Sequence, residues 1–357
     1  MRAVRLVEWQ AQPEVREVPV PVPGPGEVLV RVTAAGLCHS DVHLLEWPEG
    51  TLQYRLPFTL GHETAGVVAG LGPGAEGFAE GDAVLVYGCW GCERCRHCLS
   101  GEMNLCENAE RRGGVGGGFG HDGGLAEYML VPSARYLIPI GDLDPVQAAP
   151  LTDAALSPYR AIKARLPTLT PGTTTVVIGI GGLGHAAIRL LEALTPTRIV
   201  AIVGSRADAV ERALALGAHA AFRSEGLDLD AVRAETGSAG GAALVLDIVG
   251  TDETMRIAAG LLAVGGHATL LGIAGGSFPM SFGSVPLECS VSMNCWGSLP
   301  ELNEVVALAR AGQLHIDVET VELDDAISAL RRLAEGKVNG RVVVVPQDRG
   351  VPVPGRK

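Results

Sequence analysis

The chain has 357 residues, a length that predicts two domains. Its hydrophobic content of 47% against 19% charged residues predicts a large core and excludes a disordered chain. A net charge of −12, without a run of Lys or Arg, argues against nucleic acid or an anionic membrane surface as the main partner.

Residues 1–5 lack the apolar region of a signal peptide, and no uninterrupted apolar stretch is long enough to span a bilayer. We therefore expect a cytoplasmic location. Thiols stay reduced there, so clustered cysteines are more often metal ligands than disulfides.

Residues 1 to about 150 contain short apolar runs, such as 27–32 and 83–87, separated by Pro- and Gly-rich turn sequences. This pattern predicts a β-rich domain. The stretch 111–124 is dense in glycine, and we expect a mobile loop there.

After Pro150 the pattern changes to strands that alternate with Ala- and Leu-rich helices. The predicted strands are 175–178, 198–203, 243–248 and 267–272, and the predicted helices are 183–194 and 207–216. This alternation predicts a parallel sheet with helices on both faces, and so an α/β fold. A helix at 299–311, a short β/α segment ending at 342–345 and a frayed tail at 347–357 are expected to follow.

Four cysteines have the spacing C-x2-C-x2-C-x7-C: Cys92, Cys95, Cys98 and Cys106. Four thiolates on one short loop can hold a tetrahedral Zn²⁺ and leave no open position, which predicts a structural site. Cys89 could compete as a ligand, although the set fits without it. Cys89, Cys289 and Cys295 are interpreted as small apolar residues.

A second, looser set of metal-ligand residue types consists of Cys38, the pair His62 and Glu63, and Asp153. One Cys, one His and one carboxylate leave a coordination position for water or substrate, as in catalytic zinc sites. Each of these residues alone is weak evidence. Their occurrence together with a cofactor-binding motif is what favours the interpretation.

That motif, G-x-G-x-x-G, spans 179–184 between a predicted strand and a predicted helix, the context that dinucleotide binding requires. Its candidate cofactor-binding residues are Gly179, Gly181, Gly182, Leu183 and Gly184. The following strand ends without the Asp or Glu that usually binds the adenosine ribose of NAD. Ser205 and Arg206 stand there instead and can bind a 2′-phosphate, which favours NADP(H) over NAD(H). A solvated Arg206 at a helix start is the alternative.

The four-cysteine lobe, this glycine turn and the segments 36–41, 61–63 and 123–128 together resemble the zinc-dependent medium-chain alcohol dehydrogenases. The resemblance covers nearly the whole chain. It implies a GroES-like catalytic domain at 1–150 with a structural zinc lobe at 88–110, and a Rossmann domain at 151–295. Residues 296–357 would return to the catalytic domain, with the active site between the two domains.

The resemblance also implies roles for individual residues. Cys38, His62 and Asp153 would bind catalytic zinc, and Asp at the third position is similar to the bacterial secondary-alcohol dehydrogenases. Glu63 would exchange onto that zinc, Ser40 would take the substrate proton, and His43 would relay it, although a solvated loop histidine is an equal alternative. Further matches are Arg341 at the cofactor pyrophosphate, and Tyr54, Phe119 and Trp296 around the substrate.

The favoured function is therefore an NADP(H)-dependent, two-zinc alcohol dehydrogenase or ketone reductase for hydrophobic, secondary alcohols and their ketones. The alternatives are a polyol dehydrogenase, an NAD(H)-preferring alcohol dehydrogenase, a zinc-free quinone or enone reductase, and a non-catalytic binding protein. The partner is a small molecule, neither nucleic acid nor membrane. A homodimer or homotetramer is expected, with an edge strand around 285–293 as the pairing surface.

Overall fold

The computed structural model describes residues 1–237, 240–347 and 349–350. The chain divides into two compact units. Unit 1 comprises residues 1–153, 298–312 and 316–357, and unit 2 comprises residues 154–297 and 313–315. Most of the predicted tail at 347–357 lies outside the described residues. Among those residues, no helix is long and apolar enough to cross a membrane.

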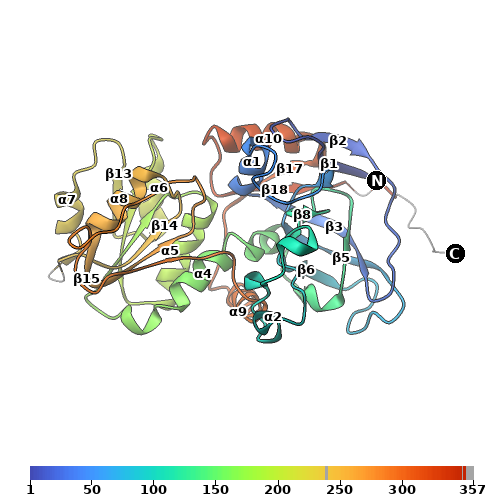
Figure 1. Ribbon diagram of the computed structural model, residues 1–357, viewed down its shortest axis with the longest axis horizontal. Coiled ribbons are helices and arrows are strands. Elements are labelled where there is room, and N and C mark those ends of the chain that lie inside the picture. Colours follow the sequence, from blue (N-terminus) through green and yellow to red (C-terminus); the bar gives the residue numbers. More distant parts are fainter. Residues whose placement is uncertain (238–239, 348, 351–357) are drawn as a thin grey trace. The chain divides into compact units, whose positions relative to one another are not determined.

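Unit 1 is built around a seven-stranded sheet that joins both ends of the sequence (Figure 1). Its strands run in the order β10 (Leu137–Pro139), β6 (Ala83–Val86), β5 (Glu63–Leu71), β3 (Val28–Leu37), β18 (Arg341–Val345) and β17 (Val318–Glu322), and β9 (Tyr128–Val131) also pairs with β3. Strands β5 and β18 flank β3 antiparallel, with Glu63 opposite Gly36 and Val342 opposite Leu37. This register places the first residues of β5 and β18 beside the last residues of β3.

Two small sheets, several helices and short 3₁₀ turns complete unit 1. Two further sheets consist of β2 (Glu14–Glu17), β1 (Arg2–Leu6) and β4 (Phe58–Thr59), and of β7 (Gly116–Gly117) with β8 (Gly120–His121). The helices are α1 (His39–Glu46), α2 (Arg96–Leu99), α3 (Pro145–Ala148), α9 (Leu299–Arg310) and α10 (Ala326–Ala334). The short 3₁₀ turns are η1 (Met103–Leu105), η2 (Glu110–Arg112), η3 (Ala134–Tyr136), η4 (Ala149–Thr152) and η7 (Leu323–Asp325).

The glycine-dense stretch at 111–124, where we expected a mobile loop, packs closely within unit 1. A Cβ atom on Gly116 would lie 1.8 Å from the carbonyl oxygen of Gly88, and one on Gly118 would lie 2.6 Å from the backbone of Gly61. These glycines are therefore needed because neighbouring backbones approach too closely for a side chain, which composition alone cannot distinguish from flexibility.

Unit 2 has a six-stranded, all-parallel sheet in the order 13–12–11–14–15–16. The strands are β11 (Thr174–Ile178), β12 (Arg198–Val203), β13 (Ala220–Arg223), β14 (Ala242–Asp247), β15 (Leu262–Leu270) and β16 (Ser290–Met293). The helices are α4 (Leu156–Lys163), α5 (Gly182–Leu194), α6 (Ala209–Ala215), α7 (Leu229–Ala234) and α8 (Asp252–Leu261), with a 3₁₀ turn η5 (Leu166–Thr168). This is the strand order of a Rossmann fold, and the predicted fold class is confirmed.

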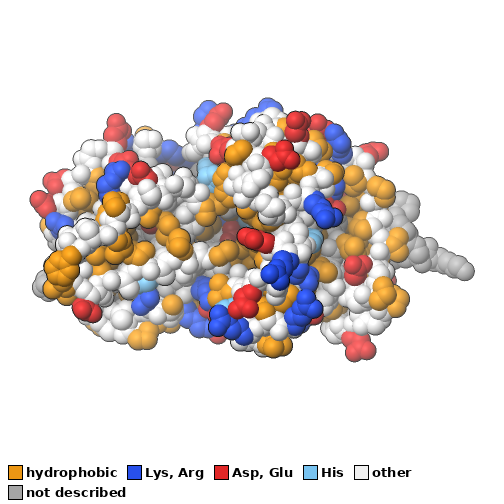
Figure 2. Space-filling model, viewed as in Figure 1, with side chains coloured by type: hydrophobic (Ala, Val, Ile, Leu, Met, Phe, Trp, Pro, Cys, Tyr) orange, Lys and Arg blue, Asp and Glu red, His pale blue; other side chains and the backbone are white. Residues whose placement is uncertain are grey.

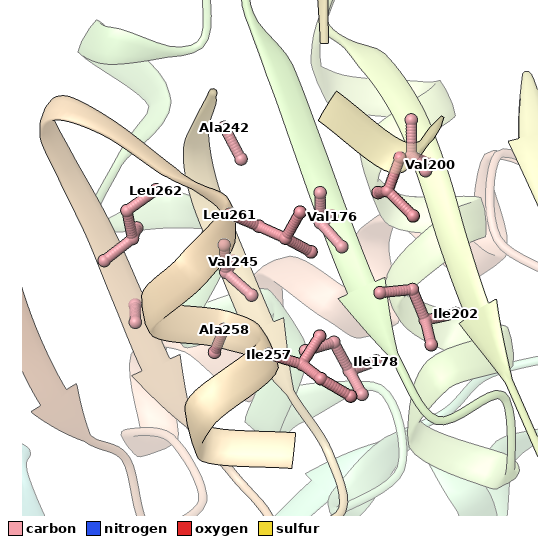
Figure 3. Packing of buried hydrophobic residues seen from close by; sticks show 12 residues of the cluster. Val176, Ile178, Val200, Ile202, Ala242, Val245, Ile257, Ala258, Leu261 and Leu262 are labelled. Carbon is pink, nitrogen blue, oxygen red and sulfur yellow. The ribbon is translucent and has the colours of Figure 1, made fainter. Parts of the chain in front are cut away.

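The sheet of unit 2 is buried on both faces. Figure 3 shows Ile257 and Leu261 of α8 pointing toward Val176 and Ile178 of β11. Successive side chains of a strand face opposite sides, so Val177, also fully buried, faces the other side, where α5 packs on β11 and β12. Burial on two faces explains why these strands appear in the sequence as continuous apolar runs.

Candidate metal centres and active site

Cys38 is held where β3 ends and α1 begins. It is the N-cap of α1, and Oδ2 of Asp41 accepts a hydrogen bond from its backbone N–H at 2.9 Å. The other carboxylate oxygen of Asp41 lies 3.3 Å from Nδ1 of His62, and Asp41 is fully buried. One carboxylate therefore orients two candidate ligands. Asp41 was not among the residues predicted from the sequence, although its place three residues after an N-cap is a capping signal.

Three side chains converge on one point in unit 1. Oδ2 of Asp153 lies 3.3 Å from Sγ of Cys38 and 3.5 Å from Nε2 of His62, and the three donor atoms all lie within 4.8 Å of one another. Ligands around tetrahedral zinc, with bonds of about 2.0–2.3 Å, stand roughly 3.3–3.8 Å apart. All three residues are buried. The donors therefore fit a zinc ion with one open position.

The electrostatics of this cluster favour a positive charge. Burial by itself would lower the pKa of His62, yet Asp41 and Asp153 hold that pKa well above its usual value. Anionic donors that stabilise a cation in a buried place are what a metal site requires. The interaction of Asp41 with Nδ1 leaves Nε2 directed at the ligand position.

Glu63 and Arg341 form a buried ion pair directly beside these ligands. Arg341 donates from Nε to Glu63 at 2.9 Å and from Nη2 at 2.5 Å, and Nη2 also lies 3.5 Å from Oδ2 of Asp153. Burial raises the pKa of Glu63, while the charge of Arg341 opposes that rise. A Cβ on Gly36 would lie 1.9 Å from this carboxylate, so only glycine leaves room for it. Arg341 thus holds Glu63 in place. The predicted contact of Arg341 with the cofactor pyrophosphate stays a prediction.

The two predicted proton-transfer residues lie on α1. Oγ of Ser40 lies 3.6 Å from Sγ of Cys38. His43, three residues further on, shares a helix face with Ser40. Its ring stacks on Trp47 with centroids 6.0 Å apart, and its Nδ1 lies 3.6 Å from a carboxylate oxygen of Glu46. Ser40 is therefore adjacent to the ligand cluster, and His43 is one helical turn away.

Of the three residues predicted to surround the substrate, Phe119 is seen in contact with a candidate zinc ligand. The ring of Phe119 contacts that of His62 edge-on, with centroids 4.9 Å apart. Tyr54 packs edge-on against Phe58 at 6.2 Å. Both belong to unit 1, whereas Trp296 belongs to unit 2, and its role in a pocket stays a prediction.

The four-cysteine group is assembled as its spacing predicts. The Sγ atoms of Cys92, Cys95, Cys98 and Cys106 lie within 4.8 Å of one another. Backbone N–H groups point at them: that of Cys92 lies 3.2 Å from Sγ of Cys106, and that of Cys95 lies 3.4 Å from Sγ of Cys92. Hydrogen bonds from the backbone, beginning with Arg94, lower the pKa of Cys92 to about 5, which favours the thiolate that zinc binds.

The other cysteines do not join either group. Cys89 is fully buried and lies outside the four-cysteine set, as expected of a small apolar residue. Cys289 is half-buried and donates to the carbonyl of Ala263 at 3.1 Å. Cys295, interpreted in the same way as a small apolar residue, is exposed and follows the edge strand β16.

The glycine turn of unit 2 has the geometry that the motif predicts. Gly179 has a φ of +89°. Gly181 is exposed with no atom within 4 Å of a Cβ placed on it, so a ligand has room there. A Cβ on Gly184 would lie 2.0 Å from the carbonyl oxygen of Gly179, so this glycine lets α5 pack on the turn. Gly182 and Leu183 open α5, whose N-terminus favours a pyrophosphate.

The end of β12 carries the residues expected at the adenosine ribose. Ser205 is exposed, and Arg206 is bound by Asp208 at 3.2 Å (Nε) and 3.0 Å (Nη2). A second arginine, Arg223, ends β13 and donates to the carbonyls of Ser205 at 3.4 Å and Ala207 at 3.1 Å. Arg223 was not predicted from the sequence, because only the parallel pairing of β12 with β13 brings it to this loop.

Comparison with known proteins agrees with this architecture. Residues 24–142 match the model of the alcohol dehydrogenase GroES-like domain, and residues 182–311 match that of the zinc-binding dehydrogenases. The chain is 35% identical to D-arabinose 1-dehydrogenase (NADP(+)) of Saccharolobus solfataricus, over 97% of each chain.

Two solved structures are also similar. The alcohol dehydrogenase of Aeropyrum pernix has a TM-score of 0.88 and 33% identity, with 97% of this chain and all of that chain covered. Acetophenone reductase from Geotrichum candidum, in complex with NAD, has a TM-score of 0.83 and 29% identity over 96% of each chain.

A GroES-like unit with two zinc-type ligand groups, joined to a Rossmann unit, defines an oxidoreductase that uses a nicotinamide cofactor. The chain belongs to the zinc-dependent medium-chain alcohol dehydrogenase family, and it is an NAD(P)-dependent alcohol dehydrogenase. Its substrates are small-molecule alcohols or carbonyl compounds.

Proposed function

We propose that this enzyme transfers hydride between NADP(H) and a hydrophobic, secondary alcohol or its ketone, with two zinc ions in each chain. The convergence of Cys38, His62 and Asp153, with Ser40 beside them, carries the proposal. The chelator-sensitive reduction of aryl ketones by purified protein tests it. Turnover that survives complete removal of zinc would favour the zinc-free reductases.

Zinc bound by Cys38, His62 and Asp153 would supply a Lewis acid for the alcohol or carbonyl oxygen. The chain's own residues handle the proton. The hydroxyl of Ser40 accepts it from the alcohol, and His43, one turn along α1, passes it to solvent. Asp41 keeps His62 oriented, and the ion pair with Arg341 holds Glu63 beside the ligand cluster.

The preference for NADP(H) is supported by the polar groups at the end of β12. No acid follows the strand directly, and Arg206 and Arg223 both lie at the loop that contains Ser205. Asp208 is the opposing feature, because it already binds Arg206. We expect kcat/KM for NADPH to exceed that for NADH, and to fall about tenfold in Arg206→Ala or Arg223→Ala, since a phosphate loses one charge-assisted contact.

A matched control for this test is Arg212→Ala, which changes a half-buried arginine of α6 that lies 4.0 Å from Asp208. It should leave the cofactor ratio unchanged. A wild-type preference for NADH would contradict the proposed preference for NADP(H). So would an NADPH affinity in both test variants that equals the affinity of the wild type.

The hydrophobic substrate is supported by Phe119, whose ring covers the candidate ligand His62. One similar structure is that of an acetophenone reductase, and one similar relative is a D-arabinose 1-dehydrogenase. The same assay therefore includes a polyol and an aldose beside aryl ketones. Faster turnover of sorbitol or arabinose than of acetophenone would favour the polyol alternative.

We further propose that the enzyme works in the cytoplasm as a homodimer or homotetramer that pairs through the edge of unit 2. Strand β16 is the last strand of its sheet, and Leu287, Val291 and Met293 expose 62%, 46% and 81% of their surface. An edge with exposed apolar side chains is suited to a second copy. Light scattering on Met293→Lys should show dissociation, whereas Leu99→Lys, which changes another exposed apolar residue, should not.

A further inference from the structure

Unit 1 contains a cavity of about 760 Å³ that the proposed reaction does not explain. It lies between the segment 49–55 and the segment 110–121. Its lining includes Tyr54, Arg55, Arg111, Arg112 and His121. Such a volume is large enough for a small organic molecule.

The cavity concentrates basic groups in an acidic protein. Arg55, Arg111 and Arg112 form no ion pair within the described part of the chain, whereas arginines elsewhere in unit 1, such as Arg2, Arg5 and Arg96, each have a carboxylate partner. Glu49 and Glu110 also line the cavity. Figure 2 shows Lys and Arg side chains gathered on the face around α2.

The lining comes within one residue of a side chain that contacts a candidate zinc ligand. Gly120 and His121 line the cavity, and Phe119, directly before them, contacts the ring of His62. A Cβ on Gly120 would lie 3.0 Å from the ring of Tyr54, so the two walls touch there. Burial and the charge of Arg112 lower the pKa of His121, which favours the neutral ring with one donor and one acceptor.

We propose that this cavity is an anion subsite: Arg55, Arg111 and Arg112 bind a carboxylate or phosphate on a substrate whose carbonyl lies at Cys38, His62 and Asp153. The middle of such a substrate is apolar, because it passes Phe119 and Tyr54. This inference rests on the proposed function and deepens it, since it names the substrate as an oxo acid or hydroxy acid. Guanidinium groups bind carboxylates and phosphates alike through two parallel hydrogen bonds. One substrate with each group therefore distinguishes which anion the subsite binds.

The experiment compares 4-acetylbenzoate, 4-acetylphenyl phosphate and the neutral methyl ester of 4-acetylbenzoate as substrates. For the wild type we expect kcat/KM to be at least about tenfold higher for one anion than for the ester, mainly through KM, because each charge-assisted contact is strong. In the double variant Arg111→Gln/Arg112→Gln, kcat/KM for the anion should fall by at least that factor. For the ester, kcat/KM should stay within about twofold of the wild-type value. The control Arg16→Gln removes an exposed arginine on β2 and should change neither.

Equal kcat/KM for anions and ester in the wild type would overturn the subsite and leave the proposed function intact. An equal loss for all three substrates in the double variant would also overturn it, because that result indicates a structural effect. If no ketone is reduced at all, the proposed function fails, and calorimetric titration with benzoate and inorganic phosphate still decides the subsite. Binding that weakens about tenfold in the double variant supports it, and no binding, or binding that the variant leaves unchanged, refutes it.

Discussion

The two candidate zinc centres of unit 1 are built in opposite ways. The four cysteines lie within one short segment, 92–106, and their donors are oriented by backbone N–H groups of that same segment. The second centre draws Cys38, His62 and Asp153 from three separate parts of the chain, and its support comes from Asp41 and Arg341. A closed site can be local, whereas an open site requires walls that only a tertiary fold provides.

The strongest test of this difference is Cys38→Ser. It removes the thiolate from the open site, so kcat/KM should fall by at least about a thousandfold, as expected when a metal's several kcal/mol of stabilisation is lost. Zinc measured by atomic absorption should fall to one ion per chain, and the melting temperature should stay close to that of the wild type. Full activity with one zinc would reverse the assignment of the two centres.

Cys98→Ala tests the closed site in the same way. Cys98 is almost fully buried, and burial raises the pKa of its thiol to about 12, so it depends on a bound metal to exist as a thiolate. We expect the loss of one zinc and several kcal/mol of stability, measured by thermal unfolding, with kcat preserved in the molecules that remain folded. A loss of kcat without a change in unfolding would show that the lobe serves chemistry.

Asp41→Asn asks how far the open site depends on its supporting groups. The amide keeps the size but loses the charge that faces Nδ1 of His62, so we expect about 10–100-fold lower zinc affinity or activity. Competition with a chelating dye measures the affinity. The control Asp122→Asn changes an exposed carboxylate that is paired with Arg5 and should leave zinc binding unchanged.

The same contrast explains how much could be predicted from the sequence. The four cysteines, the glycine turn and the alternating strands of unit 2 are local patterns, and all three are present as expected. Arg223 and the arginines around the cavity were missed, because their positions depend on strand pairing or on segments that meet only in the fold. Asp41 was missed although its capping of α1 is a local signal, and its contact with His62 forms only in the fold. The close packing at 111–124 could not be predicted from glycine density, since flexibility and close packing require the same residue.

A polar contact in unit 2 shows the same dependence on tertiary structure at a smaller scale. His267 of β15 lies with Nδ1 at 2.7 Å from Oγ of Ser290 and Nε2 at 2.9 Å from Oγ of Ser292, both on β16. Burial, aided by Arg165, lowers its pKa to about 4. The neutral ring therefore ties the edge strand to the sheet.

The pH dependence of stability follows from this lowered pKa. Between about pH 6.5 and pH 4 the unfolded chain binds a proton that folded His267 does not, so the free energy of unfolding should fall as the pH falls through that range. His267→Gln should flatten this slope, which urea unfolding at several pH values measures. An unchanged slope in His267→Gln would mean that the contact with β16 does not depend on a neutral ring.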